Sequence, residues 1–306
     1  MYELWLRARR KWFFLRGNGR GVTRYSNLIA SRRTINGLKD RFDEMVPPGI
    51  NVEINTNCNY ACAFCPQSSW RRPVRYMTWD TFEVLIKRLE DIDYAGRVCM
   101  SVNNEPFLHP LVLKFCETIT RRLPKARGSL ISNGALITKE HLLALAKLEI
   151  PPHLQINDYT LGHTVSKRLE AMFAEDQVLS RIPFAIALRG SAERLSNRAG
   201  SQPGCESNLE DYQDIVCTWP FIGMFLTPEL KAFLCCSDYQ HRIIMGDLGG
   251  STVMSIWRSE AYRNLRCHMM SKARSGLTLC AECDTEWFSL PAPRTALGVA
   301  RRRGVE

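Results

Sequence analysis

Short apolar runs alternate with longer segments of mixed polarity between residues 50 and 190. In the longer segments apolar residues recur every three or four positions, which predicts amphipathic helices, whereas the short runs predict buried strands. Thr78 is a suitable N-cap for one such helix, because its hydroxyl can accept a hydrogen bond from the first turn. The expected strands cover residues 50–55, 97–102, 128–132, 153–156 and 183–188, and the expected helices begin near residues 78, 112, 138 and 165.

Strands that alternate with helices favour a parallel sheet built from βα units. We therefore expect an α/β fold, a partial (β/α)6 TIM-like barrel, whose chemistry lies at the C-terminal ends of the strands. Cys99 falls in an expected strand and Cys116 on the apolar face of an expected helix, so both are expected in the core.

A polar stretch over residues 190–216 separates this barrel from a second apolar region. There, runs at 221–226 and 231–236 flank a turn that contains Pro228, which predicts a β-hairpin. A helix is expected near residues 255–265. The expected organisation is a basic N-terminal extension (1–45), the barrel (46–205), a small C-terminal β-hairpin/helix domain (206–290) and a basic tail (291–306).

Hydrophobic residues make up 45% of the 306 residues and charged residues 24%, which is ordinary for a globular protein. The net charge of +10 is concentrated at the ends, since residues 1–41 carry +9 and residues 291–306 carry +3, which leaves −2 for the rest. This distribution argues against a nucleic-acid enzyme, whose binding would depend on neutralising phosphates. No run is apolar enough to span a membrane and no secretory signal is visible, so a cytoplasmic protein is expected.

The N-terminal residues 3–16 mix aromatic side chains with arginines at roughly helical spacing. This pattern suits a helix in peripheral contact with an anionic membrane surface. It also suits an N-terminal helix whose aromatic side chains cover the bottom of the barrel, which is the interpretation we prefer.

Twelve cysteines in such a chain are expected to bind metal rather than form disulfides, because the cytosol keeps thiols reduced. Cys58, Cys62 and Cys65 form a C-x3-C-x2-C pattern directly after the first expected strand. Three thiolates leave one iron of a [4Fe–4S] cluster open to a small molecule, as an open position does at a catalytic zinc. A zinc knuckle is the alternative, but it lacks a fourth ligand at close spacing.

A second set of cysteines follows the spacing C-x17-C-x44-C-x2-C and comprises Cys217, Cys235, Cys280 and Cys283. The predicted hairpin returns the first two of them to one place. Four thiolates can close a tetrahedral zinc site or saturate a [4Fe–4S] cluster. We choose Cys235 rather than its neighbour Cys236 as a ligand, because adjacent residues of a strand point to opposite sides.

The stretch from Asn57 to Pro66, with Phe64 before the last thiol, resembles the cluster loop of the radical S-adenosylmethionine (SAM) enzymes. The resemblance covers residues 50–190. It implies that the open iron chelates the amino and carboxylate groups of SAM, which one electron cleaves to methionine and a 5′-deoxyadenosyl radical. An electron donor such as flavodoxin or ferredoxin is implied as a partner.

Three further stretches, at the ends of the second, third and fifth expected strands, resemble motifs of the same family. Glu105 is implied as the charged partner of the SAM amino group, and the backbone of Leu188 as a contact of adenine. Both glycines that the family often has before the glutamate are replaced here by asparagine. Besides Phe64, the residues implied in SAM binding are Asn103, Asn104, Glu105, Ser132, Asn133 and Leu188.

The second cysteine set resembles the auxiliary-cluster module called the twitch domain, a shortened SPASM domain. Its spacing is similar to that in the radical SAM dehydrogenases that oxidise aminocyclitols. The resemblance implies a second [4Fe–4S] cluster, held by four cysteines and without an open iron, which suits electron transfer.

Three functions are compatible with these patterns. The first is a dehydrogenase of a hydroxyl-bearing carbon in a small polyol, amino sugar or cyclitol, in which Arg189 would bind the substrate hydroxyl or the SAM carboxylate. The second is a radical epimerase of a sugar or peptide, in which Cys267 or Cys236 would donate a hydrogen atom instead of serving only in packing. The third is a non-catalytic iron–sulfur or zinc protein.

Overall fold

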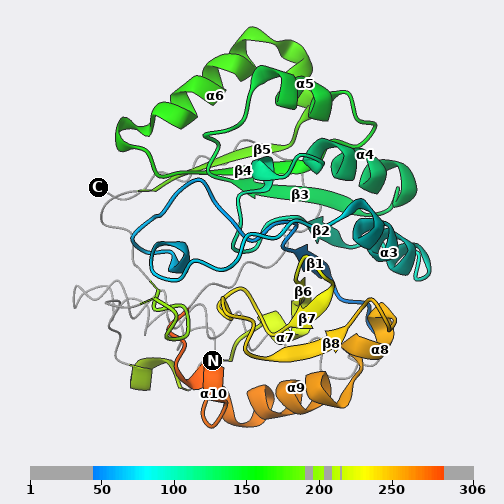
Figure 1. Cartoon of the computed structure of the whole chain (residues 1–306), viewed down its shortest axis with the longest axis vertical. Helices are drawn as coiled ribbons and strands as arrows, with labels where there is room; N and C mark the ends of the chain where they lie inside the picture. Colours follow the sequence, from blue (N-terminus) through cyan, green and yellow to red (C-terminus); the bar gives the residue numbers. More distant parts are fainter. Residues whose placement is uncertain (1–43, 190–195, 203–208, 214–215, 286–306) are drawn as a thin grey trace, which may run out of the picture.

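The computed structural model describes residues 44–189, 196–202, 209–213 and 216–285. The first half of the chain alternates strands and helices, as predicted. Its strands are β1 (Gly49–Val52), β2 (Arg97–Cys99), β3 (Arg127–Ser132), β4 (His153–Asp158) and β5 (Phe184–Leu188). Its helices are α3 (Trp79–Glu90), α4 (Val112–Arg122), α5 (Lys139–Ala146) and α6 (Thr164–Glu175), and they lie along one side of the sheet (Figure 1).

The eight strands form one sheet in the order β5-β4-β3-β2-β1-β6-β7-β8. Strands β1 to β5 are parallel, and β6 (Gly223–Leu226) continues the sheet in parallel beyond β1, with Ile50 opposite Met224. The hairpin strand β7 (Lys231–Phe233) and then β8 (Ile244–Asp247) add antiparallel edges. The α/β class and the open sheet of a partial barrel are confirmed, and the sixth parallel strand comes from the C-terminal hairpin.

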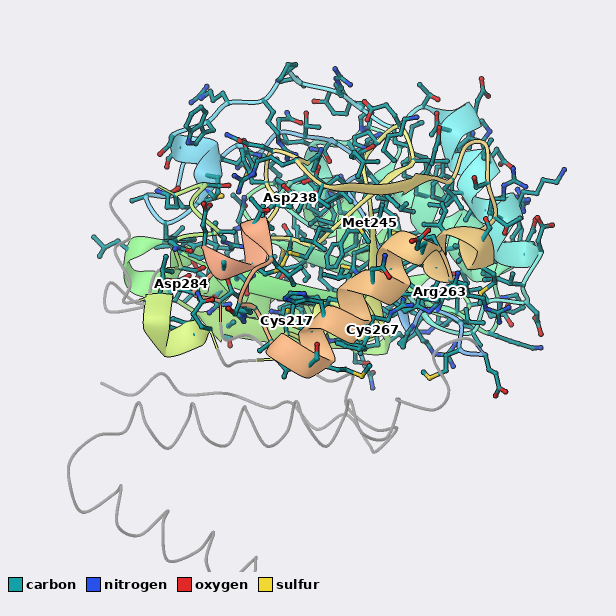
Figure 2. All side chains as sticks on the ribbon, turned by 90° about the horizontal axis from the view of Figure 1, so that it is seen from below. Cys217, Asp238, Met245, Arg263, Cys267 and Asp284 are labelled. Carbon is teal, nitrogen blue, oxygen red and sulfur yellow. The ribbon has the colours of Figure 1, made fainter. Side chains whose placement is uncertain are left out.

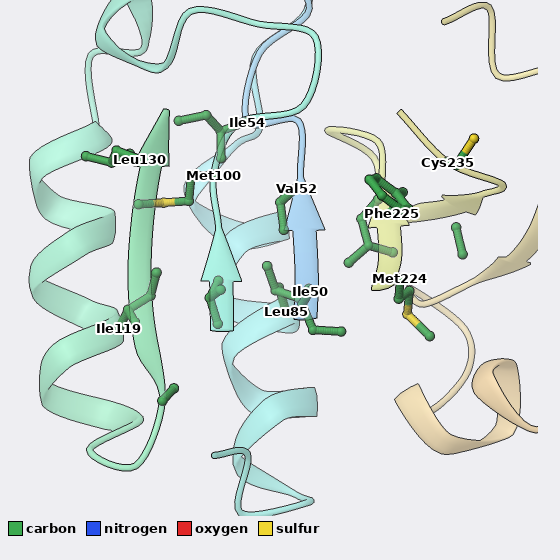
Figure 3. Close-up of a cluster of buried hydrophobic side chains, with 14 of the residues drawn as sticks. Ile50, Val52, Ile54, Leu85, Met100, Ile119, Leu130, Met224, Phe225 and Cys235 are labelled. Atoms are coloured by element: carbon green, nitrogen blue, oxygen red, sulfur yellow. The ribbon is translucent and has the colours of Figure 1, made fainter. Parts of the chain in front are cut away.

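Helix α3 shows how local sequence fixes these elements. The hydroxyl of Thr78 accepts a hydrogen bond from the Thr81 amide at 3.1 Å, which caps the helix as predicted. The apolar residues of the helix at three- and four-residue spacing, among them Leu85, are buried against the sheet. Ile50 and Val52 of β1 lie between this helix layer and Met224 and Phe225 of β6, so that one core serves both halves of the chain (Figure 3).

The C-terminal part of the chain covers the β6–β8 end of the sheet with short helices. They are α7 (Trp219–Ile222), α8 (Val253–Trp257), α9 (Glu260–Lys272) and α10 (Thr278–Ala281). The predicted hairpin is confirmed, with Phe225 opposite Phe233. Because β6 pairs with β1, the sheet runs across the boundary that the sequence suggested near residue 205. The predicted division into a barrel domain and a hairpin domain stays a prediction.

Two cysteines lie in the core as predicted, whereas both ends of the chain lie outside the described residues. Cys99 and Cys116 are buried in β2 and α4, as expected, and burial raises the pKa of Cys116 to about 12. The N-terminal stretch 3–16, with its two interpretations, and the basic tail 291–306 lie outside the described residues. None of the described helices is both long and apolar enough to cross a membrane.

Candidate functional site

The first cysteine set lies in the loop that leaves β1, at the C-terminal end of the parallel strands. Cys58, Cys62 and Cys65 are all partly exposed. The Cys65 amide donates to the Cys62 carbonyl oxygen at 2.8 Å, and the Tyr60 amide donates to the Cys58 sulfur at 3.4 Å. These bonds fold the loop so that the three thiols border one cavity.

A buried glutamine joins this loop to the next strand end. The Gln67 side-chain amide donates to the Thr56 carbonyl oxygen at 2.9 Å and to the Asn103 carbonyl oxygen at 2.8 Å. Asn103 in turn donates from its side chain to the Cys236 carbonyl oxygen at 3.0 Å. The loop after β2 therefore contacts both the first cysteine loop and the segment of the second cysteine set.

Glu105 is the central carboxylate of the site and is only 1% exposed. It accepts hydrogen bonds from the Ser132 hydroxyl at 2.7 Å, the Asn133 amide at 2.9 Å and the Phe107 amide at 3.2 Å. Burial raises its pKa, and these bonds from neutral donors only partly oppose the effect. A cation that entered the cavity would stabilise the ionised carboxylate.

The ends of β1, β2 and β3 are thus held together by polar side chains. The Asn133 side-chain amide donates to the Asn59 side-chain oxygen at 2.8 Å and lies 3.7 Å from the Cys58 sulfur. Asn104 donates to the Asn55 side-chain oxygen at 3.0 Å. The strand ends that the sequence marked as motifs therefore meet around the cysteine loop.

The cavity enclosed by these strand ends has a volume of about 240 Å³. Phe64 lines it and packs against Tyr159, with the ring centroids 4.9 Å apart. Arg189 does not line the cavity, but it donates to the side-chain oxygen of Asn157, which does, at 3.3 Å. Leu188 is exposed at the end of β5 and also does not line it. The predicted residues that line the cavity are Cys58, Cys62, Phe64, Cys65, Asn103, Asn104, Glu105, Ser132 and Asn133.

The second cysteine set is brought together by the hairpin, α9 and α10. The thiol of Cys235 is buried, and its pKa is raised by burial and by the neighbouring thiols of Cys236, Cys217, Cys283 and Cys280. Burial also raises the pKa of Cys217 to about 11 and that of Cys280 to about 12. All four predicted ligands therefore lie near one another in a region from which water is largely excluded.

Cys235 and Cys236 differ in their neighbours. All three other predicted ligands raise the pKa of Cys235, whereas Cys236 is partly exposed and interacts with Cys217, Cys283 and Arg198. The alternation expected from a strand does not separate the two thiols, because β7 ends at Phe233. The choice of Cys235 as the ligand stays a prediction.

Cys267 is exposed, whereas all seven predicted ligands are buried or partly buried. It is exposed on α9, whose residues are drawn in Figure 2, and it does not line the cavity beside Cys58. Its thiol is therefore poorly placed to donate a hydrogen atom to a molecule bound in that cavity.

The described thiols are not arranged to hold a single metal ion. Nowhere in the described ranges do three His, Cys, Asp or Glu side chains group closely enough to hold one ion. Ligands of a [4Fe–4S] cluster bind different irons, so their sulfur atoms need not converge on one point. Two groups of thiols, one of three and one of four, fit two such clusters.

Family models match both regions. The model described as the radical SAM superfamily matches residues 52–172, and that of the SPASM iron–sulfur cluster-binding domain matches residues 217–284. The chain contains a radical SAM domain followed by a SPASM domain. Its cofactors are accordingly SAM and iron–sulfur clusters.

Several known proteins resemble this one along most of its length. The S-adenosyl-L-methionine-dependent 2-deoxy-scyllo-inosamine dehydrogenase of Niallia circulans is 25% identical over 236 residues, which is 77% of this chain and 92% of the relative. The crystal structure of BtrN in complex with AdoMet and 2-DOIA has a TM-score of 0.67 and 23% identity, and the match covers 79% of this chain and 94% of that one. Streptococcus suis SuiB bound to its precursor peptide SuiA has a TM-score of 0.51 and 13% identity, with 85% and 76% covered. The structural likenesses establish the fold.

The sequence did not reveal all the residues around the cavity of the radical SAM domain. Tyr60, Gln67, Asn157, Tyr159 and Arg198 also line it. Asn157 and Tyr159 stand at the end of β4, so their position after a strand was an available signal. Arg198 belongs to the stretch that the sequence marked only as a linker, and nothing in its local pattern pointed to the cavity.

A buried ionic group that the sequence did not predict lies behind the cysteine loop. Glu53 is fully buried and accepts two hydrogen bonds from Arg72 at 2.9 Å, one contact from His241 at 3.1 Å and one from the Asn103 amide at 3.2 Å. Burial alone would raise the pKa of Glu53, but the hydrogen bond from His241 and the charge of Arg72 lower it. Because Arg72 also stacks on Tyr239 at 4.2 Å, the group fastens the SPASM segment to the radical SAM loop.

The turn after β3 gives a prediction about stability. Gly134 has φ +77°, and a Cβ atom there would lie 2.7 Å from Val165 and 3.1 Å from Ile156 and Leu169. We expect Gly134→Ala to lower the free energy of unfolding by about 3 kcal/mol, through backbone strain and overpacking together. Gly162 has φ +69° but open space around it, so Gly162→Ala should lose only about 1 kcal/mol. Denaturant unfolding of both variants at equal iron content measures the difference, and equal losses would contradict the packing argument.

Proposed function

We propose that this protein is a radical SAM dehydrogenase that oxidises a hydroxyl-bearing carbon of a small polyol, amino sugar or cyclitol. SAM and a cluster held by Cys58, Cys62 and Cys65 would supply a 5′-deoxyadenosyl radical, which takes a hydrogen atom from the substrate carbon. The hydroxyl proton and one electron then leave the substrate, the electron passing to the auxiliary site, and a ketone remains. A reductant of the flavodoxin or ferredoxin class would supply the electron that starts the cycle.

Residues around the cavity have distinct roles in this proposal. Glu105, buried among neutral donors, is placed to balance the charge of the SAM ammonium group. Asn133 bridges β3 and the cysteine loop and would contact the ribose or carboxylate of SAM. Arg189 would act through Asn157, whose side-chain oxygen it holds, and orient that residue toward a substrate hydroxyl.

The observation that carries the proposal is the second cysteine set. Four thiols, three of them buried and that of Cys217 partly buried, can saturate a [4Fe–4S] cluster, which then has no open iron for a substrate and is suited to accept an electron. The hydrogen bond from Asn103, which lines the cavity, to the Cys236 carbonyl oxygen supports electron transfer between the two sites. The name of the Niallia circulans relative, at 25% identity, supports a dehydrogenase acting on an aminocyclitol.

Product analysis tests the proposal. The reconstituted protein is incubated anaerobically with a reductant, SAM and an aminocyclitol such as 2-deoxy-scyllo-inosamine, in deuterated water. We expect a product two hydrogens lighter than the substrate, formed in step with 5′-deoxyadenosine. An unchanged skeleton that has gained one solvent deuterium would instead identify a radical epimerase, and a series of aminocyclitols, sugars and peptides that all fail to be oxidised would contradict the proposal.

A further inference from the structure

A buried arginine lies beside the SPASM cysteines, away from the cavity. Arg274 follows the C-terminal end of α9 and is only 1% exposed. Its guanidinium donates to the carbonyl oxygens of Cys283 and Thr285, and its backbone amide donates to the Gln213 carbonyl oxygen at 3.1 Å. Both acceptors of the guanidinium are neutral, so these bonds hold the side chain in place without cancelling its charge.

Arg274 lies directly against the second cysteine set. Its guanidinium contacts the backbone of Cys283, a predicted ligand, so its buried positive charge is held close to the place where the auxiliary cluster would bind. Within the part of the chain that the structure describes, the buried Nε–H of Arg274 also has no hydrogen-bond partner. A buried N–H without an acceptor is costly, so this donor, on a guanidinium that contacts Cys283, calls for an acceptor at this place.

A cluster held by four thiolates carries net negative charge, which increases when it accepts an electron. The reduction potential of such a cluster depends on nearby charge and on hydrogen bonds to its sulfur atoms. Charges interact strongly where water is excluded. We propose that Arg274 raises the reduction potential of the auxiliary cluster by stabilising the added negative charge, and so fits this site to accept an electron from a substrate radical.

The role that we assign to Arg274, in accepting an electron from the substrate, rests on the proposed dehydrogenase function. Its effect on the reduction potential does not. The electron that Arg274 stabilises is the one that leaves the substrate together with the hydroxyl proton as the ketone forms. The reduction potential itself can be measured without SAM or substrate. A failure of the inference is therefore distinguishable from a failure of the proposed function.

A buried carboxylate provides a variant with the opposite effect. Asp238 is fully buried and accepts hydrogen bonds from the backbone amides of Arg242 at 2.8 Å and Ile243 at 2.9 Å (Figure 2). Its backbone amide donates to the Cys235 carbonyl oxygen at 3.0 Å, so this negative charge lies against the same cysteine set as the positive charge of Arg274. Removing the charge of Asp238 should therefore make the auxiliary cluster easier to reduce.

The experiment uses the full chain with Cys58, Cys62 and Cys65 changed to alanine, so that the auxiliary cluster gives the only cluster signal. A redox titration followed by electron paramagnetic resonance measures its potential. For Arg274→Gln we expect the equilibrium constant for reduction to fall at least tenfold, which is about 59 mV for one electron. Arg274→Lys, which keeps the charge, should retain most of the potential, and Asp238→Asn should raise it.

Arg266 provides the matched control. It is a second buried arginine of the same module, held by the carbonyl oxygens of Pro220 and Trp257 and stacked 4.0 Å from the Trp257 ring. Arg266→Gln should lower stability without a comparable change in potential. An unchanged potential in Arg274→Gln with full iron content would overturn the inference. If Arg274→Gln does not retain its cluster, the potential of Asp238→Asn tests the inference instead. An unchanged or lower potential in Asp238→Asn would contradict the electrostatic account.

Discussion

Replacing Cys58, Cys62 and Cys65 together with alanine should reduce SAM cleavage to background. These thiols border the cavity with Glu105, and without them no cluster remains to bind and reduce SAM there. After anaerobic reconstitution we expect about eight irons in the unchanged protein and about four in the variant, since the cysteines group as three plus four. Iron analysis and measurement of 5′-deoxyadenosine test both numbers.

A buried cysteine outside the two sets serves as the control. Cys116 packs on α4 in the core, so Cys116→Ala should lower stability while iron content and SAM cleavage persist. Loss of all iron in the triple variant would contradict two independent clusters. Zinc at the second cysteine set in strictly anaerobic protein would contradict an auxiliary iron–sulfur cluster.

The first half of the fold was predictable because its signals are local. Periodic apolar residues marked α3 to α6, and short apolar runs marked β1 to β5, whose observed ranges overlap those expected. The cap at Thr78 also follows from one residue type at one position. Such features depend on neighbours along the chain, which a single sequence contains.

The pairing of β6 with β1 was not predictable in the same way. Met224 stands opposite Ile50, far away in sequence, and nothing in either run specifies the other as its partner. Both strands are continuously buried, so each reads as a core strand whatever lies beside it. The hairpin was visible, but its place as a continuation of the parallel sheet came only from the structure.

The same distinction applies to the candidate site. Cysteine spacing and the residues after β1, β2 and β3 indicated the cysteines and Glu105, because family motifs occupy short stretches. Arg198 reaches the cavity from a polar connection, and Glu53 meets Arg72 and His241 from separate parts of the chain. These contacts depend on tertiary folding and have no local pattern.

Replacing Cys217 with alanine should separate the two halves of the proposed reaction. Cys217 is a predicted ligand of the auxiliary cluster and does not line the cavity beside Cys58. SAM cleavage should therefore continue in the presence of substrate, while the oxidised product falls to background because the substrate radical has no electron acceptor. The ratio of 5′-deoxyadenosine to product, with iron content measured alongside, gives the result.

The matched variant is Cys267→Ala, which removes an exposed thiol from α9 and no predicted ligand. A dehydrogenase does not need a hydrogen-atom donor, so this variant should form 5′-deoxyadenosine and product in the same ratio as the unchanged protein. An epimerase that used this thiol would instead form 5′-deoxyadenosine without the epimer. If Cys267→Ala loses product at full iron content while Cys217→Ala keeps it, the roles assigned to the two thiols are reversed, and the epimerase becomes the better account. Persistence of product in both variants would show that the electron leaves the substrate by a route other than the SPASM cluster.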